Sequence, residues 1–294
     1  MAHTDHKRFY PTAQAWCDAP YKQVSVFGMS GLGKTRISNM LRTGGDWFHY
    51  SVDYRIGTRY MDEHIVDNFK RHAMRDPFLA PLLLSDSIYI ASNIAFDNLT
   101  PLATYIGKPG NPALGGINID EYQNRQRQHH RAEIAALQDT PHFISRAREL
   151  YGYNHFICDS GGSICEVVNP DDPNDPILST LAEHMLLVWI RHTADHTQAL
   201  IDRFRQCPKP MYYHPEFLTT KWAEYKRQQG QEDDAIDPDK FAIWMYAQVL
   251  EHRQPLYAAM AKHWGITVDA TDVANLRTPD DFTMLIETAL PTHI

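Results

Sequence analysis

The sequence is poor in several features that would place it in a specialised class. It has four cysteines among 294 residues and no C-x-x-C pair, so we expect free thiols and no disulfide framework. No hydrophobic run is long enough to span a membrane, and residues 1–8 do not form an apolar signal segment. We therefore expect a cytoplasmic protein with no membrane partner.

An excess of positive charge is also missing. The chain has 28 lysines and arginines against 36 acidic residues, for a net charge of −8, whereas proteins that bind nucleic acid generally present a basic face. Nucleic acid is therefore a disfavoured partner. Sixteen histidines are present, but the closest pairs, His129 with His130 and His192 with His196, have no acidic partner in an H-E-x-x-H pattern, so the ligand set of a structural metal site is incomplete.

What the chain does contain is a phosphate-binding loop in a confirming context. Residues 28–35 read GMSGLGKT and match G-x-x-x-x-G-K-[ST]. The alternating β-branched and aromatic residues 23–27 predict a strand before the loop, and residues 36–42 have the periodicity of a helix after it. The alternative, a glycine-rich turn with an incidental Gly-Lys-Thr, does not account for both flanks.

This arrangement suits a nucleoside triphosphate. Glycines allow successive backbone N–H groups to point at phosphate oxygens, and the N-terminus of the helix attracts the same anion. Lys34 is expected to reach the β- and γ-phosphates, and the Thr35 hydroxyl to hold Mg²⁺. The residues predicted to bind ATP in this segment are Gly28, Ser30, Gly31, Leu32, Gly33, Lys34, Thr35 and Arg36.

Two acidic residues follow predicted strands. Asp53 comes directly after the strand at 48–52, where ligands bind in open α/β sheets; it is predicted to act on a substrate, with Arg55 nearby, although capping of the next helix is the alternative.

Asp159 ends the apolar run 155–159, which has the Walker-B form. Asp159 is predicted to hold Mg²⁺ together with Thr35. The turn at Gly161 and Gly162 lets the backbone approach a ligand closely.

The stretch 56–150 is too long for a simple crossover and has helical patterns at 61–74 and 122–137, with loop chemistry at 107–116. We interpret it as a helical insertion that builds a substrate pocket or cover. Arg127 and Arg131 share one helix face; they are predicted substrate contacts, or otherwise solvated charges.

The rest of the chain predicts further α/β elements. Strands are expected at 185–190 and 265–270, helices at 13–17, 193–204 and 279–290, and helical structure over 215–264 with a polar interruption at 228–239. The segment 207–213 contains two prolines and cannot be regular helix. Its Lys209 and the preceding Arg205 are predicted lid cations over the phosphates, or otherwise basic residues that complement a helix C-terminus.

The order of these parts resembles the shikimate-kinase-like branch of the P-loop nucleoside and small-molecule kinases, over about 23–56, 153–164, 183–213 and 250–290. The family pattern G-x-x-G-x-G-K-[ST] is met in the loop. By this resemblance Asp53 orients the acceptor hydroxyl. Ser51 stands where a second acid is often found, which leaves Mg²⁺ to Asp159.

The resemblance implies further site residues. Gly161 and Gly162 correspond to the glycine turn that holds substrate, and Arg253, in an R-x-P-x-Y-like segment, to the arginine that grips it. Lys209-Pro210 corresponds to an arginine-proline step of the lid, where lysine keeps the charge but not the bidentate fork. The loop 269–275 would border adenine. The insertion has no counterpart, so shikimate itself is not predicted.

We therefore expect a three-layer α/β P-loop NTPase fold with a parallel sheet of about five strands. We expect one domain over 1–294, with the helical insertion at 57–150 and a lid and helical extension at 203–250. The leading hypothesis is ATP- and Mg²⁺-dependent phosphorylation of a small-molecule hydroxyl, with Lys34, Asp53 and Asp159 as catalytic residues. The alternatives are an ATPase that acts as a nucleotide-dependent switch for a protein partner and, less favoured, a kinase acting on a nucleic-acid end. Neither the acceptor nor the oligomeric state follows from the sequence.

Overall fold

The structure is a computed structural model that describes residues 8–292, without the side chains of residues 194 and 195. Residues 1–7 lie outside the described part. A five-stranded sheet organises the chain. Its strands are β1 (Gln23–Phe27), β2 (Trp47–Ser51), β3 (His155–Asp159), β4 (Leu186–Arg191) and β5 (Gly265–Asp269).

All neighbouring strands are parallel, in the order β2-β3-β1-β4-β5. Every residue of β1 is buried, as expected for a central strand covered on both faces. Because β1 is flanked by strands that come much later in the sequence, its carboxyl end lies at a switch point in the strand order, where ligands bind in this class of sheet.

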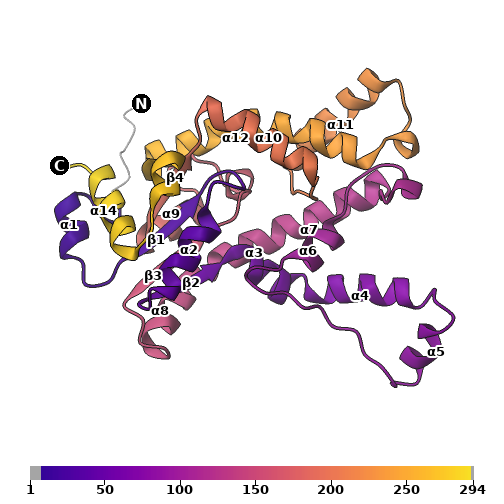
Figure 1. Ribbon diagram of the computed structural model, residues 1–294, viewed down its shortest axis with the longest axis horizontal. Coiled ribbons are helices and arrows are strands. Elements are labelled where there is room, and N and C mark those ends of the chain that lie inside the picture. The colour runs from indigo at the N-terminus through magenta and orange to yellow at the C-terminus, as the bar shows by residue number, and fades with distance from the viewer. Residues whose placement is uncertain (1–7, 293–294) are drawn as a thin grey trace. The chain divides into compact units, whose positions relative to one another are not determined.

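Helices cover both faces of the sheet and produce three layers (Figure 1). On one face α2 contacts β2, β3 and α14; on the other α8 contacts β2, β3 and α9, and α9 contacts β4. The helices are α1 (Ala13–Asp18), α2 (Lys34–Thr43), α3 (Val52–Arg55), α4 (Asp62–Ala73), α5 (Leu79–Leu84), α6 (Thr100–Ile106), α7 (Ile119–Gln138), α8 (Thr140–Glu149), α9 (Pro176–His184), α10 (Ala194–Gln206), α11 (Pro215–Gln229), α12 (Pro238–Trp264), α13 (Ala270–Asn275) and α14 (Pro279–Ala289).

The predicted α/β fold with a parallel five-stranded sheet and a long helical insertion is confirmed. The last helix, α14, is capped by Thr278, whose side chain accepts a hydrogen bond from the Asp281 backbone N–H at 3.2 Å. One expectation was wrong. The segment 269–275 was predicted as a loop, but Ala270–Asn275 forms α13, in which Ala270 and Val273 lie three residues apart and are both buried.

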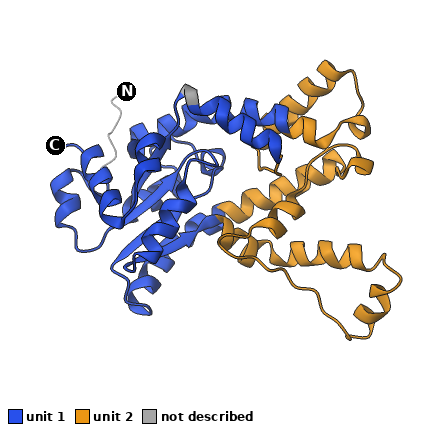
Figure 2. Cartoon of the chain, viewed as in Figure 1, with its two compact units in different colours: residues 1–52, 134–207, 243–294 blue, residues 53–133, 208–242 orange. Residues whose placement is uncertain are grey.

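The chain divides into two compact units (Figure 2). Unit 1 comprises the described residues of 1–52, 134–207 and 243–294 and holds the sheet; unit 2 comprises 53–133 and 208–242 and is helical. Unit 2 overlaps both the predicted insertion at 57–150 and the predicted lid region at 203–250. The prediction of one domain over 1–294 with these two parts stays a prediction. Among the described helices, none combines the length and hydropathy needed to cross a membrane.

Candidate nucleotide-binding site

The loop between β1 and α2 has a backbone that only glycine adopts easily. Gly28 has a φ of 135°, and a Cβ atom there would lie 2.7 Å from the carbonyl oxygen of Ile190. Gly33, with a φ of 97°, is the N-cap of α2. This cap supplies no side-chain hydrogen bond, and the first turn of α2 has no acidic residue. The N-terminal N–H groups of α2 are thus left available for an anion.

Lys34 is the cation of this loop. Its side chain is buried, and its Nζ donates hydrogen bonds to the carbonyl oxygens of Gly28, at 2.8 Å, and Met29, at 3.0 Å. The ammonium group of Lys34 therefore lies against the backbone of the phosphate-binding loop. A buried ammonium interacts more strongly with a phosphate than an exposed one, because solvent screens it less.

Thr35, in the first turn of α2, meets Asp159 at the carboxyl end of β3. Thr35 Oγ1 donates a hydrogen bond to Asp159 Oδ2 at 2.9 Å. Asp159 lies in register with Val26 of β1 on one side and Ser51 of β2 on the other. The other carboxylate oxygen of Asp159, Oδ1, accepts a hydrogen bond from the backbone N–H of Gly161 at 3.3 Å.

These oxygens fit Mg²⁺, which prefers hard oxygen ligands and commonly takes one or two carboxylates together with substrate phosphates and water. In the part of the chain that the structure describes, no group of three or more histidine, cysteine or acidic side chains is arranged to hold a metal. Thr35 and Asp159 supply two oxygen donors, so phosphate and water oxygens would have to complete the coordination of a Mg²⁺ ion bound here.

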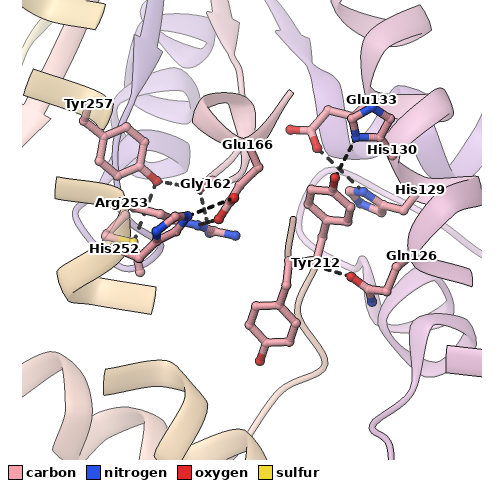
Figure 3. Close-up of polar contacts among 12 residues, drawn as sticks. Gln126, His129, His130, Glu133, Gly162, Glu166, Tyr212, His252, Arg253 and Tyr257 are labelled. Carbon is pink, nitrogen blue, oxygen red and sulfur yellow. Dashed lines mark hydrogen bonds and ion pairs between the residues drawn. The ribbon is translucent and has the colours of Figure 1, made fainter. Parts of the chain in front are cut away.

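The glycine turn after β3 is tied to α12 by a buried ion pair (Figure 3). Arg253, 2% exposed, donates from Nε to Glu166 Oε1 at 2.7 Å and from Nη1 to the Gly162 carbonyl at 2.8 Å. The hydroxyl of Tyr257, one turn further along α12, donates to the same carbonyl. A Cβ at Gly162 would lie 3.4 Å from the backbone nitrogen of Ser30, so this turn lies directly beside the phosphate-binding loop.

The charges of this pair stabilise each other. Burial favours the neutral form of Glu166, but the charge of Arg253 and the hydrogen bonds from His252 and Arg253 outweigh it and lower the pKa of Glu166 to about 2. The Glu166 Oε2 atom lies 3.4 Å from His252 Nε2. Burial lowers the pKa of Arg253, but Glu166 more than reverses this, and the pKa is raised overall. Both groups are therefore ionised at neutral pH.

The predicted cations of unit 1 have partners within the unit. Arg36 donates to the carbonyl of Leu276 at 3.0 Å and to that of Val273, which holds α13 against α2. Arg205 is exposed and pairs with Asp202 at 3.0 Å. Arg203, which the sequence analysis did not select, reaches the phosphate-binding loop, with Nη1 3.4 Å from the Gly31 carbonyl.

The spacing of residues along α10 indicates that Arg203 faces the phosphate-binding loop. Leu200 is buried, and its Cδ2 would lie 3.2 Å from a Cβ at Gly31. Arg203 is three residues further on and shares that face, whereas Arg205 does not. A second missed residue is Trp189 of β4, whose buried Nε1 has no hydrogen-bond partner among the described residues and whose ring lies beside Gly28.

In unit 2, Asp53 and Arg55 lie in α3, directly after β2, and both are partly buried. The Arg55 guanidinium lies 5.6 Å from the centre of the Tyr60 ring. Arg127 and Arg131 are exposed on α7. Of these two, Arg127 lines a cavity of about 370 Å³, together with Gln123, Gln126, Pro215, Glu216, Leu218, Thr219 and Thr220.

Lys209 is exposed in the irregular segment between α10 and α11. The residues that follow it are fixed to α7 (Figure 3). Gln126 accepts the Tyr213 N–H at 2.8 Å, His130 Nδ1 lies 2.7 Å from the Tyr212 hydroxyl, and the His129 ring stacks on Tyr212 at 4.9 Å. His129 also lies 3.6 Å from the buried carboxylate of Glu133. The predicted lid segment is therefore anchored on its C-terminal side.

The structure thus brings Lys34, Thr35, Asp159, Gly162 and Arg253 together in unit 1. The predicted acceptor residues Asp53, Arg55, Arg127 and Arg131, and the lid residue Lys209, belong to unit 2, and their roles stay predictions.

Comparison with known proteins adds little to this description. No protein-family model matches the chain, and no curated protein matches its sequence. Among solved structures, the chain is similar to a shikimate kinase from Bacteroides thetaiotaomicron, with 12% sequence identity, coverage of 91% of this chain and 96% of that chain, and a TM-score of 0.37. A likeness at this identity and TM-score assigns no function to the chain.

Proposed function

We propose that this protein is an ATP- and Mg²⁺-dependent kinase that transfers the γ-phosphoryl group to a hydroxyl of a small molecule. The observation that carries the proposal is the hydrogen bond of 2.9 Å between Thr35 and Asp159, next to the buried Lys34 of a strand–glycine loop–helix element. The combination of an oxygen pair suited to Mg²⁺, a buried ammonium group and an open helix N-terminus supports binding of a nucleoside triphosphate.

Within this proposal each residue has a defined role. The backbone N–H groups of the loop would hold phosphate oxygens, and Lys34 would place its positive charge beside the β- and γ-phosphates. Mg²⁺, held by the oxygens of Thr35 and Asp159, would neutralise further phosphate charge when bound. Catalysis of phosphoryl transfer depends mainly on such positioning and charge stabilisation.

The acceptor hydroxyl is assigned to Asp53. This residue lies two positions after Ser51, the last residue of β2, which is in register with Asp159. A carboxylate can orient a hydroxyl group and accept its proton as the oxygen attacks phosphorus. Arg127 is the candidate for recognition of an anionic group on the acceptor, because it lines the cavity of unit 2.

The first experiment is a thermal-shift screen of metabolites and nucleosides in the presence of Mg²⁺ and a non-hydrolysable ATP analogue. A ligand that binds the native state raises the melting temperature. We expect a hydroxyl-bearing metabolite to stabilise the protein only when the analogue is present. Stabilisation by the analogue alone, with no response to any metabolite, would favour the nucleotide-dependent switch.

Two substitutions then test the roles on the acceptor found. Lys34→Ala is expected to lower turnover at least about a hundredfold, as does loss of one electrostatic donor in other active sites. Asp53→Asn is expected to spare binding of the ATP analogue while lowering phosphoryl transfer. The control is Asp97→Asn, an exposed acid of unit 2, which should leave transfer unchanged. Full transfer activity in Asp53→Asn would refute the acceptor assignment.

A further inference from the structure

Residues 74–91 of unit 2, here called the apolar arm, contain no buried residue, although more than half of them are hydrophobic. The exposed fractions are 74% for Phe78, 76% for Leu84 and 88% for Tyr89, with Met74 at 42%. The helix α5 at the centre of the arm has the sequence LAPLLL and no buried residue. Figure 2 shows α4 and α5 at one end of the orange unit.

The arm is nevertheless a defined structure rather than a loose loop. Asp76 Oδ1 accepts the backbone N–H groups of Phe78, at 2.8 Å, and Leu79, at 3.0 Å, at the start of α5. The Ser87 N–H donates to the Leu82 carbonyl at 2.9 Å at its end. Beyond the arm, the Ser92 hydroxyl donates to Asp62 of α4, and Ile94 is buried. The apolar side chains are thus presented to solvent by a segment fixed at both ends.

The exposed apolar area of the arm is comparable in size with the area that one partner contributes to a protein interface. A phenylalanine or tyrosine side chain buries about 150–250 Å², so Phe78 and Tyr89 alone offer a few hundred Å². Leu84 and the partly exposed Leu79, Leu82 and Leu83 of α5 add to this area, and a stable interface buries roughly 800 Å² per partner. Monomeric proteins rarely expose contiguous apolar patches beyond a few hundred Å². The arm therefore matches a macromolecular surface and not a small ligand.

The charges at the two ends of α5 identify the occupant. Arg75 precedes α5 and Asp86 follows it; both are exposed. Neither side chain makes a hydrogen bond or ion pair with another described residue. Asp76 lies beside Arg75 and is also exposed, but its carboxylate accepts the N–H groups of Phe78 and Leu79, so Arg75 is the charge without a partner among the described residues at this end. A patch with an apolar centre, an unpaired cation at one end and an unpaired anion at the other is complementary to a copy of itself turned through a two-fold axis, which is the commonest symmetry of protein dimers.

We propose that the apolar arm is a dimerisation surface that pairs with the arm of a second copy of this chain. The two α5 helices lie antiparallel, so that Arg75 of each copy faces the partner's Asp86 and the apolar side chains pack between these two ion pairs. This inference does not depend on the proposed kinase activity.

The first test compares three forms of the full-length protein by sedimentation velocity over a range of protein concentrations. The wild type is expected to dimerise, and the double variant Phe78→Ser with Leu84→Ser to raise the dissociation constant at least about a hundredfold, since both residues are central to the arm. The control is Leu114→Ser, an exposed leucine of unit 2 outside the arm, 58% exposed, which should dimerise like the wild type. Equal melting temperatures of the three forms, measured at a concentration low enough for each to be monomeric, would show that the variants fold.

The second test uses charge reversal. Arg75→Asp alone and Asp86→Lys alone each place like charges opposite one another in both ion pairs, and each is expected to weaken dimerisation about tenfold. Because Asp86 has a φ of 52°, a lysine there adds backbone strain, so its effect must be judged by mixing. An equimolar mixture of the two variants restores opposite charges in both pairs and should form a mixed dimer.

Three outcomes would overturn the proposal. One is a wild-type protein that stays monomeric at the highest soluble concentration. Another is a dimer unaffected by the serine substitutions or by charge reversal. The third is a monomer that co-sediments with phosphatidylserine–phosphatidylcholine vesicles through Phe78 and Leu84, which would make the arm a membrane-binding surface.

Discussion

The buried site cations of unit 1 and the candidate acceptor-binding cations of unit 2 are held in different ways. In unit 1, Lys34 and Arg253 are buried and donate hydrogen bonds within the unit, to the glycine loop, to Gly162 and to Glu166. In unit 2, Arg127 and Arg131 are exposed on α7, and neither makes a hydrogen bond or ion pair with another described residue. A buried, bonded charge is part of the fold, so its removal affects stability; an exposed one is dispensable to the fold, so its removal affects only binding.

The largest effect is expected at the Glu166–Arg253 pair. Glu166→Ala leaves the buried Arg253 guanidinium without its carboxylate, and breaking such a pair costs about 3–5 kcal/mol. The double variant Glu166→Leu with Arg253→Met should be less destabilised than the sum of Glu166→Leu alone and Arg253→Met alone, because no charge is left unpaired. Urea unfolding of the wild type, the two single variants and the double variant completes this cycle. If the single and double effects simply add, the two residues do not act as a pair.

A second effect concerns the pH dependence of stability. His49 of β2 is buried, and burial lowers its pKa to about 4 against the opposing charge of Asp159. The unfolded chain, with a histidine pKa of about 6.5, binds more protons between these two values. The free energy of unfolding therefore contains a contribution of about 3 kcal/mol that is complete above pH 6.5 and is lost as the pH falls to about 4.

Glu166 acts in a lower window. Its folded pKa of about 2 lies below the ordinary value of 4.5, so its contribution is present above pH 4.5 and is lost as the pH falls toward 2. Urea unfolding at a series of pH values is the measurement. His49→Gln should reduce the change of the free energy of unfolding between pH 4 and pH 6.5, the upper window, and leave the change below pH 4.5, the lower window, as it is in the wild type. His155→Gln is the comparison: His155 is only half-buried and burial lowers its pKa as well, so this change should flatten the upper window less than His49→Gln does. An unchanged upper window in His49→Gln would contradict the assignment.

How much of this could be read from the sequence depends on how local each feature is. The phosphate-binding loop was predicted because its glycines, Lys34 and Thr35 define the backbone and the chemistry within eight residues. The strands were predicted because each is a short β-branched or aromatic run. The pairing of Glu166 with Arg253, 87 residues apart, depends on how α12 packs, and no local pattern specifies it. The same holds for the exposure of the apolar arm, since LAPLLL reads equally well as a buried segment.

A smaller effect separates the exposed arginines of unit 2. Arg127 lines the 370 Å³ cavity and Arg131 does not. If the acceptor carries an anionic group, Arg127→Ala should raise its KM about tenfold, the loss of one hydrogen bond to a charged group, with kcat little changed. Arg131→Ala, one helical turn away, is the matched control and should stay within about twofold. Equal effects of the two substitutions would point to general electrostatic attraction, not to a contact in the cavity.

The smallest effect tests the choice between two neighbouring arginines of α10. Arg203 reaches the Gly31 carbonyl at 3.4 Å, whereas Arg205 pairs with Asp202. The contact of Arg203 is long and exposed, so Arg203→Ala should weaken binding of a fluorescent ATP analogue only a few-fold, in line with about 0.5–1 kcal/mol for an exposed polar contact. Arg205→Ala removes the same charge from the same helix and should leave the affinity unchanged. Equal weakening by Arg205→Ala and Arg203→Ala would support the prediction from the sequence that Arg205 is a lid cation. It would also show that a position on the Leu200 face of α10 does not distinguish the arginine that contacts the nucleotide.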